Sequence, residues 1–160
     1  MRALSFVLAA VVVVGVGAAS SREEPSSLML CRGGESEAGL PAGAAEATRT
    51  VRIDMSDRMR FAPEALSVKR GETVRFVAAN GGRVLHELVI GTRAELAQHA
   101  ALMRLSPQWH DEFASASTHV LPGREGELAW RFSRTGEFYF ACLIPGHLEA
   151  GMIGTITVTP

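Results

Sequence analysis

This 160-residue chain has no excess of either sign of charge, and it has few long apolar runs. Sixteen Lys and Arg residues nearly balance 17 Asp and Glu residues, so the formal net charge is −1. A chain without a basic excess lacks the electrostatic surface that binds nucleic acid, and we expect no nucleic-acid partner. The one long apolar run lies at the amino terminus, so the rest of the chain is not expected to form an integral membrane span.

That amino-terminal segment has the three parts of a secretory signal. Arg2 supplies positive charge, residues 4–16 are apolar apart from Ser5, and small residues follow at 17–19. This pattern predicts a signal peptide over residues 1–19 and a mature protein in the periplasm, with a retained amino-terminal anchor as the alternative. Residues 20–49 are rich in Ser, Glu, Gly and Ala without any helical or strand period, which predicts a flexible leader. Residues 50–160 then have the size of one domain.

Cysteine is rare as well, with only Cys31 and Cys142 in the whole chain. Exported proteins normally use their cysteines in disulfides. A bridge between these two would tie the predicted leader to a buried strand position, which disfavours it. A Cys142 that stays reduced in an oxidising compartment needs protection, and a bound metal would provide it.

The pattern of residues 50–160 predicts an all-β domain. Residues 73–78 alternate between buried and exposed types, residues 127–133 do the same, and short extended runs recur between them. The turn signals Asn80-Gly81 and Pro122-Gly123 separate these runs. Short strands with turns every 8 to 12 residues are typical of a β-sandwich or barrel.

Three potential metal donors follow one another near the carboxyl end. Cys142, His147 and Met152 lie in FYFACLIPGHLEAGMIG (138–154), with four residues between each pair. Strand alternation directs Cys142 inward on the same side as Phe138 and Phe140, and Pro145-Gly146 then bends the chain back. With one more imidazole, the set of two nitrogens, a thiolate and a thioether is that of an electron-transfer copper centre.

This stretch resembles the copper loop of the cupredoxins, the blue-copper proteins of the plastocyanin and azurin type. The resemblance covers roughly residues 50–160 and implies a Greek-key fold. It also implies that the missing imidazole lies upstream on another strand, where RVLHELVIG (83–91) offers His86. We therefore predict one type 1 copper ion held by His86, Cys142, His147 and Met152.

The surroundings of these ligands depart from the family pattern at one position. Glu87 stands where an asparagine often ties the two copper loops together, so that particular link is not predicted. His119 precedes a turn and is left outside the site. The apolar residues around His147 form a candidate surface for partner docking, and they are Leu143, Ile144, Pro145 and Leu148.

One helix is expected to interrupt the strands. Residues 93–105 contain helix formers without Gly or Pro, Thr92 is suited to cap the amino terminus, and a stripe is expected along one face at Ala97, Ala101 and Leu105. His99 and Met103 face the same way on this helix, and His110 follows. These residues indicate either a second, softer copper site or, more simply, a surface histidine beside a packed methionine. Met55 and Met59 are either exposed thioether donors or, more simply, strand residues that fill the core.

Two functions fit these features. The first is an exported carrier that passes single electrons by Cu(I)/Cu(II) cycling to a redox protein. The alternative is a periplasmic copper-tolerance or copper-delivery protein that sequesters the ion and meets other copper-handling proteins. An enzyme is not expected, because an inward thiol is poorly placed as a nucleophile and the chain has no His-x-His pair for further coppers. We expect a monomer.

Overall fold

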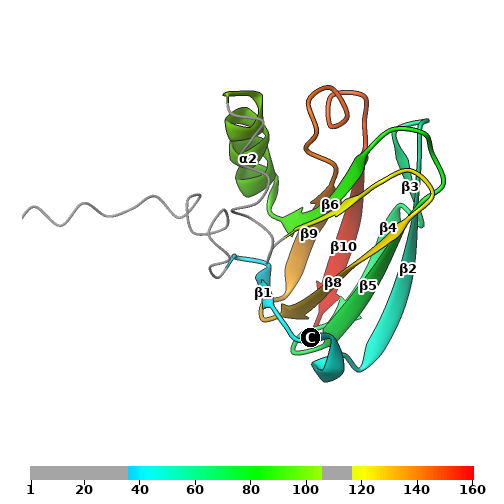
Figure 1. The fold of residues 1–160 in the computed structure, drawn as a ribbon. Coiled ribbons are helices and arrows are strands. Elements are labelled where there is room, and N and C mark those ends of the chain that lie inside the picture. Colours follow the sequence, from blue (N-terminus) through cyan, green and yellow to red (C-terminus); the bar gives the residue numbers. More distant parts are fainter. Residues whose placement is uncertain (1–35, 106–116) are drawn as a thin grey trace, which may run out of the picture.

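The computed structural model describes residues 36–105 and 117–160, which form a β-sandwich with a helix at one side (Figure 1). One sheet has the strand order β1-β8-β5-β2-β3 and the other has the order β4-β10-β9-β6-β7. The strands are β1 (Gly39–Pro41), β2 (Arg49–Ser56), β3 (Arg60–Ala62), β4 (Ala65–Lys69), β5 (Thr73–Asn80), β6 (His86–Gly91), β7 (Ser117–Val120), β8 (Glu125–Phe132), β9 (Gly136–Ala141) and β10 (Ile153–Thr159). The helices are η1 (Ala44–Glu46), a short 3-10 turn, and α2 (Arg93–Leu105). The predicted all-β sandwich with an inserted helix is confirmed.

The core lies between the two sheets and is built by period-2 alternation. In β2, for example, Val51, Ile53 and Met55 are buried while the residues between them are exposed. The largest fully buried side chain is Trp130 of β8. Phe61 of β3 meets Phe140 of β9 edge to face, with ring centroids 5.0 Å apart, so this pair joins the two sheets.

The two methionines expected to fill the core differ in their positions. Met55 lies in β2 and is 1% exposed, as predicted. Met59 lies in the turn between β2 and β3 with a positive φ of 58°, and it is only partly buried. Its assignment to a strand is therefore wrong, although it still packs against the core.

The helix α2 covers part of the outer face of the second sheet. Its amino terminus is capped as predicted: Glu95 N–H donates to Thr92 Oγ1 (3.2 Å), and Thr92 N–H donates to Glu95 Oε2 (2.7 Å). These reciprocal bonds satisfy two backbone donors that a helix end leaves unpaired. Leu96 packs with Val89 of β6 and Tyr139 of β9 in a second cluster of buried residues.

The face that α2 buries differs from the predicted stripe by one position. The buried side chains are Leu96, His99, Ala100 and Met103. Leu105 is 81% exposed, so the expected Ala97, Ala101 and Leu105 stripe does not face the sheet. The bulky Leu96 and Met103 lie on the buried side, because burying them removes more apolar surface from water than burying alanines. His99 is 2% exposed, so its description as a surface histidine is also wrong.

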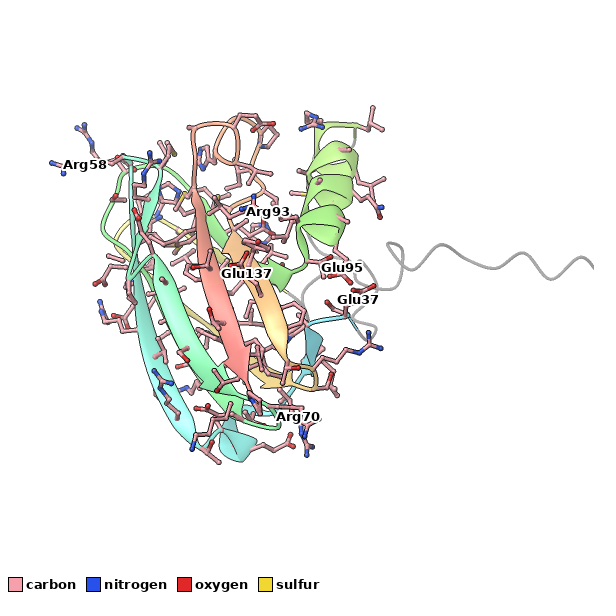
Figure 2. All side chains as sticks on the ribbon, turned by 180° about the vertical axis from the view of Figure 1, so that it is seen from behind. Glu37, Arg58, Arg70, Arg93, Glu95 and Glu137 are labelled. Carbon is pink, nitrogen blue, oxygen red and sulfur yellow. The ribbon has the colours of Figure 1, made fainter. Side chains whose placement is uncertain are left out.

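The domain begins earlier than the sequence suggested. β1 pairs antiparallel with β8, with Gly39 opposite Phe132, and Ala38 is fully buried. Ser36 Oγ donates to Glu95 Oε2 (2.8 Å), and Figure 2 shows Glu37 near Glu95 below α2. The predicted flexible leader over 20–49 is therefore wrong for residues 36–49. The small residues that suit a linker also permit close approach of two backbones, as Gly39 of β1 shows beside Arg131 of β8.

Several predictions concern residues outside those described. They are the signal peptide (1–19), the first part of the leader (20–35), Cys31 and His110. Along the described part of the chain, no helix has both the length and the hydropathy needed to cross a bilayer.

Replacing Gly39 tests whether the segment before β2 is part of the domain. Gly39 has a φ of +136°, and a Cβ there would lie 1.9 Å from the carbonyl oxygen of Arg131. We expect Gly39→Ala to lower the free energy of unfolding by about 2–4 kcal/mol, from backbone strain and the displaced β1. Urea denaturation of the mature chain measures the change.

Gly71→Ala is the matched control, because Gly71 also has a positive φ (+85°) but a Cβ there would meet nothing within 4 Å. We expect the control to cost only about 1–2 kcal/mol. Equal effects at both positions would contradict the docking of β1 onto β8.

Candidate metal centre

Two neighbouring strands bring the candidate donors to one end of the second sheet. His86 is the first residue of β6, and Cys142 directly follows β9. These strands pair antiparallel, with Val89 opposite Ala141, so the start of one lies beside the end of the other. His147 lies in the loop that connects β9 to β10, which emerges at the same end (Figure 1).

The side chains of His86, Cys142 and His147 converge. One donor atom from each residue lies within 4.8 Å of the others. Cys142 Sγ is 3.3 Å from His147 Nδ1, and the two imidazole centroids are 5.1 Å apart. His86 and Cys142 are fully buried, whereas His147 is partly exposed. The arrangement is a cluster of two imidazole donors and one sulfur, of which only His147 reaches the surface.

Met152 is tied to the same donor cluster through its backbone. Its carbonyl accepts the N–H of Cys142 (3.1 Å), and its own N–H donates to the carbonyl of His147 (3.0 Å). The side chain is fully buried and belongs to the core cluster that contains Cys142. The position of Met152 is therefore fixed beside the site, and ligation by its sulfur stays a prediction.

The loop between Cys142 and Met152 is held by its own turns and by a neighbouring strand. His147 N–H donates to Ile144 O (2.9 Å), and Gly151, with a φ of +93°, lets the chain turn back toward β10. Arg60 of β3 donates from Nη1 to the carbonyl oxygens of Met59 (2.8 Å) and Ala150 (2.9 Å). The metal loop is thus anchored to the turn between β2 and β3.

The electrostatics of the three donors suit a soft cation. Burial raises the pKa of the Cys142 thiol to about 12, although Glu87 N–H donates to its sulfur (3.3 Å). Burial, followed by the nearby His86, lowers the pKa of His147, so its imidazole is neutral at pH 7 and has a lone pair to donate. Within the described residues, both ring nitrogens of His86 are buried without a hydrogen-bond partner. An orphaned nitrogen beside a thiol and a second imidazole fits a copper ion.

Glu87 makes the link between the two loops that the sequence did not predict. Its side chain is 1% exposed, and Oε2 accepts the N–H of Leu143, the residue after Cys142 (3.3 Å). Burial raises the pKa of Glu87 to about 7, while hydrogen bonds from Leu143 and Ser117 oppose the shift. A carboxyl group thus occupies the bridging role that the family usually gives to an asparagine.

His119 lies nearer to this site than the sequence indicated. It sits on β7 opposite Glu87, and its Nε2 is 3.3 Å from Glu87 Oε1. It does not belong to the donor cluster, as expected, but it contacts the residue that braces the cluster. Asp57 was also missed, and its Oδ1 lies 3.4 Å from His86 Nε2. Neither contact has a signal in the single sequence, because both depend on which loops and strands become neighbours.

The structure gives no support for the second copper site. Among the described residues, His86, Cys142 and His147 are the only group of three His, Cys, Asp or Glu side chains that could hold a metal ion. His99 and Met103 are buried on the inner face of α2, and His110 lies outside the described residues.

Comparisons with known proteins agree with this geometry. The family model described as copper-binding proteins of the plastocyanin/azurin family matches residues 47–159. A protein of Rubrivivax gelatinosus named copper-resistant cuproprotein CopI is 55% identical over 120 residues, covering 75% of this chain and 72% of that protein. A protein of the same name in Pseudomonas aeruginosa is 37% identical over 150 residues, covering 76% and 82%. The solved structure of auracyanin B is 26% identical with a TM-score of 0.62, covering 76% of this chain and 96% of that one.

The burial of Glu87 predicts a pH dependence of stability in the metal-free protein. The pKa of Glu87 rises from an ordinary 4.5 to about 7 on folding, so the folded state keeps a proton that the unfolded state releases. This contribution to stability is complete below pH 4.5 and is lost as the pH rises through about 7. We expect a loss of up to roughly 3 kcal/mol over that interval, measured by urea denaturation.

Glu87→Gln is the matched control, because the amide has nearly the same shape and does not ionise. Its free energy of unfolding should change less with pH than that of the wild type over the same interval. Parallel pH profiles for the two proteins would show that Glu87 does not retain its proton on folding.

Proposed function

Because the chain belongs to the plastocyanin/azurin family of copper-binding proteins, we propose that it is a periplasmic copper-tolerance protein that holds one copper ion at a type 1 site. The convergence of His86, Cys142 and His147 within 4.8 Å supports this proposal most directly. The names of the two CopI relatives support the tolerance function over the electron carrier that the sequence first favoured.

Each proposed ligand has a distinct role. Cys142 gives the thiolate, and His147 gives Nδ1, the ring nitrogen that faces the sulfur at 3.3 Å. His86 gives Nδ1, since its Nε2 faces Asp57. Met152, at the closing end of the loop, would offer a weakly held thioether to a bound copper ion. Copper bound there would supply one-electron exchange between Cu(I) and Cu(II).

The enclosure of the donors suits retention of the ion. His86 and Cys142 are 0% exposed, and the metal loop is braced by Arg60 and Glu87. Of the three converging donors, only His147 is partly exposed, so an ion held between them would be largely shielded from solvent. This shielding favours retention of the ion, and sequestration requires binding without catalysis.

Electron transfer is the second candidate function. The donor set supports it, because two imidazoles and a thiolate are the ligands of electron-transfer copper centres. The partly exposed edge of His147, with Ile144 and Leu148 partly buried nearby, would be the contact point for a redox partner. A copper-handling protein would approach the same edge if the function is tolerance.

The proposed site predicts an intense colour. The mature protein loaded with Cu(II) should bind one ion and show strong visible thiolate-to-copper charge-transfer absorption. Cys142→Ser should abolish that band, because it removes the sulfur donor. The measurement is visible spectroscopy with copper quantified per chain.

Cys31→Ser is the matched control, since it removes the other cysteine of the chain and should leave the band unchanged. Colourless copper binding by the wild type would rule out the type 1 site. Loss of the band in Cys31→Ser but not in Cys142→Ser would assign the thiolate to Cys31 and contradict the proposed site.

Growth of a gene-deletion strain separates the two functions. For a tolerance protein we expect growth to fall at raised copper while respiration at ordinary copper is unchanged. The wild-type gene should restore growth, and the Cys142→Ser gene should not, because its product cannot retain the ion. A respiratory defect at ordinary copper, with normal copper tolerance, would favour the electron carrier instead.

A further inference from the structure

Asp57 faces the imidazole of His86 from a separate loop. It lies in the turn between β2 and β3, which belong to the sheet that does not contain β6. Its Oδ1 is 3.4 Å from His86 Nε2, which is longer than a strong hydrogen bond but within the range of a charge–dipole contact. His86 is fully buried, so few other groups can satisfy this nitrogen.

The carboxylate is fixed in this position by backbone donors. Arg83 N–H donates to Asp57 Oδ2 (2.8 Å) and Oδ1 (3.0 Å), and Val84 N–H lies 3.4 Å from Oδ1. Gly82 allows this approach, because a Cβ there would lie 2.0 Å from Asp57 Oδ1. The loop that leads into His86 is therefore built around the Asp57 carboxylate.

The charge of Asp57 is only partly balanced. Its two oxygens face the backbone N–H groups of Arg83 and Val84, neither of which carries a formal charge. The Arg83 guanidinium is 4.0 Å away, but that side chain is 97% exposed and its charge is screened by water. Arg58 at the tip of the same turn points outward into solvent (Figure 2).

We propose that Asp57 is a positioning residue that keeps His86 in the Nε2–H tautomer, directs Nδ1 to the metal, and favours Cu(II) over Cu(I) by its negative charge. The inference rests on the proposed copper site. A neutral imidazole has one N–H and one lone pair, so a carboxylate beside Nε2 places the proton there and the lone pair on Nδ1. Carboxylates that accept from a metal-bound histidine orient the ring and make it a stronger donor.

The test is Asp57→Asn, with Asp54→Asn as the matched control. Asp54 lies on β2 and is 60% exposed beside Arg52, so its replacement removes the same charge without touching His86. Asp57→Asn should weaken Cu(II) binding about 10- to 100-fold. We expect the ratio of Cu(II) to Cu(I) affinity to fall about tenfold, which corresponds to a reduction potential about 59 mV higher. The control should leave both quantities unchanged.

Nitrogen NMR of the metal-free protein tests the same inference without copper. The wild type should show His86 protonated at Nε2, and Asp57→Asn should shift the tautomer population toward Nδ1–H. Asparagine keeps an oxygen for the Arg83 and Val84 donors, so the variant is expected to fold.

Three outcomes are distinguishable. A wild-type His86 protonated at Nδ1 would overturn the inference, whether or not the variant folds. Equal affinity ratios for Asp57→Asn and Asp54→Asn would overturn the preference for Cu(II). If the wild type binds no copper but shows the Nε2–H tautomer, the proposed function fails while the positioning role of Asp57 stands.

Discussion

The metal centre depends on a sulfur atom placed where a negative charge is unfavourable. Burial raises the pKa of Cys142 to about 12, so at neutral pH the metal-free site holds a neutral thiol. A metal must displace that proton, which makes binding pH-dependent and favours ions that bond strongly to sulfur. The neighbouring Glu87 N–H, 3.3 Å from the sulfur, offsets only part of the cost. The same burial that protects the thiol from oxidation therefore contributes to the choice of ion.

Such a site is useful only if its loop is already in place, and three elements hold it. Arg60 binds the carbonyl of Ala150 from β3, and buried Glu87 binds the backbone of Leu143 from β6. The third contact is an ion pair from α2, Arg104 to Glu149 at 2.9 Å. Both of its side chains are about half exposed, so it contributes less than the contact of Glu87, which is removed from water. The bracing of the loop thus comes mainly from bonds to its backbone.

The sequence predicted those parts of the molecule that local patterns determine. Strand alternation predicted that Cys142 points inward, and the residue types at the start of α2 predicted Thr92 as its amino-terminal cap. The choice of His86 required the family resemblance, because nothing local connects it to a loop more than 50 residues away. The contact of Asp57 with His86 and the pairing of Glu87 with His119 depend on tertiary packing, so neither could be predicted from the sequence. Residues 36–49 were misjudged because small residues suit a linker and a close strand contact equally well.

The two carboxylates lie on opposite sides of the strand that carries His86. Side chains alternate along β6, so His86 shares the face of the inner core with Leu88, whereas Glu87 shares the outer face with Val89 under α2. Asp57 approaches His86 from the inner face, and Glu87 accepts a hydrogen bond from the backbone of Leu143 on the outer face. A cation at the proposed site would lower the pKa of Glu87 and favour its ionised form, which would add to the negative field of Asp57. That field stabilises Cu(II) relative to Cu(I). Such a preference is a greater advantage to a protein that retains copper than to one that must exchange electrons readily in both directions.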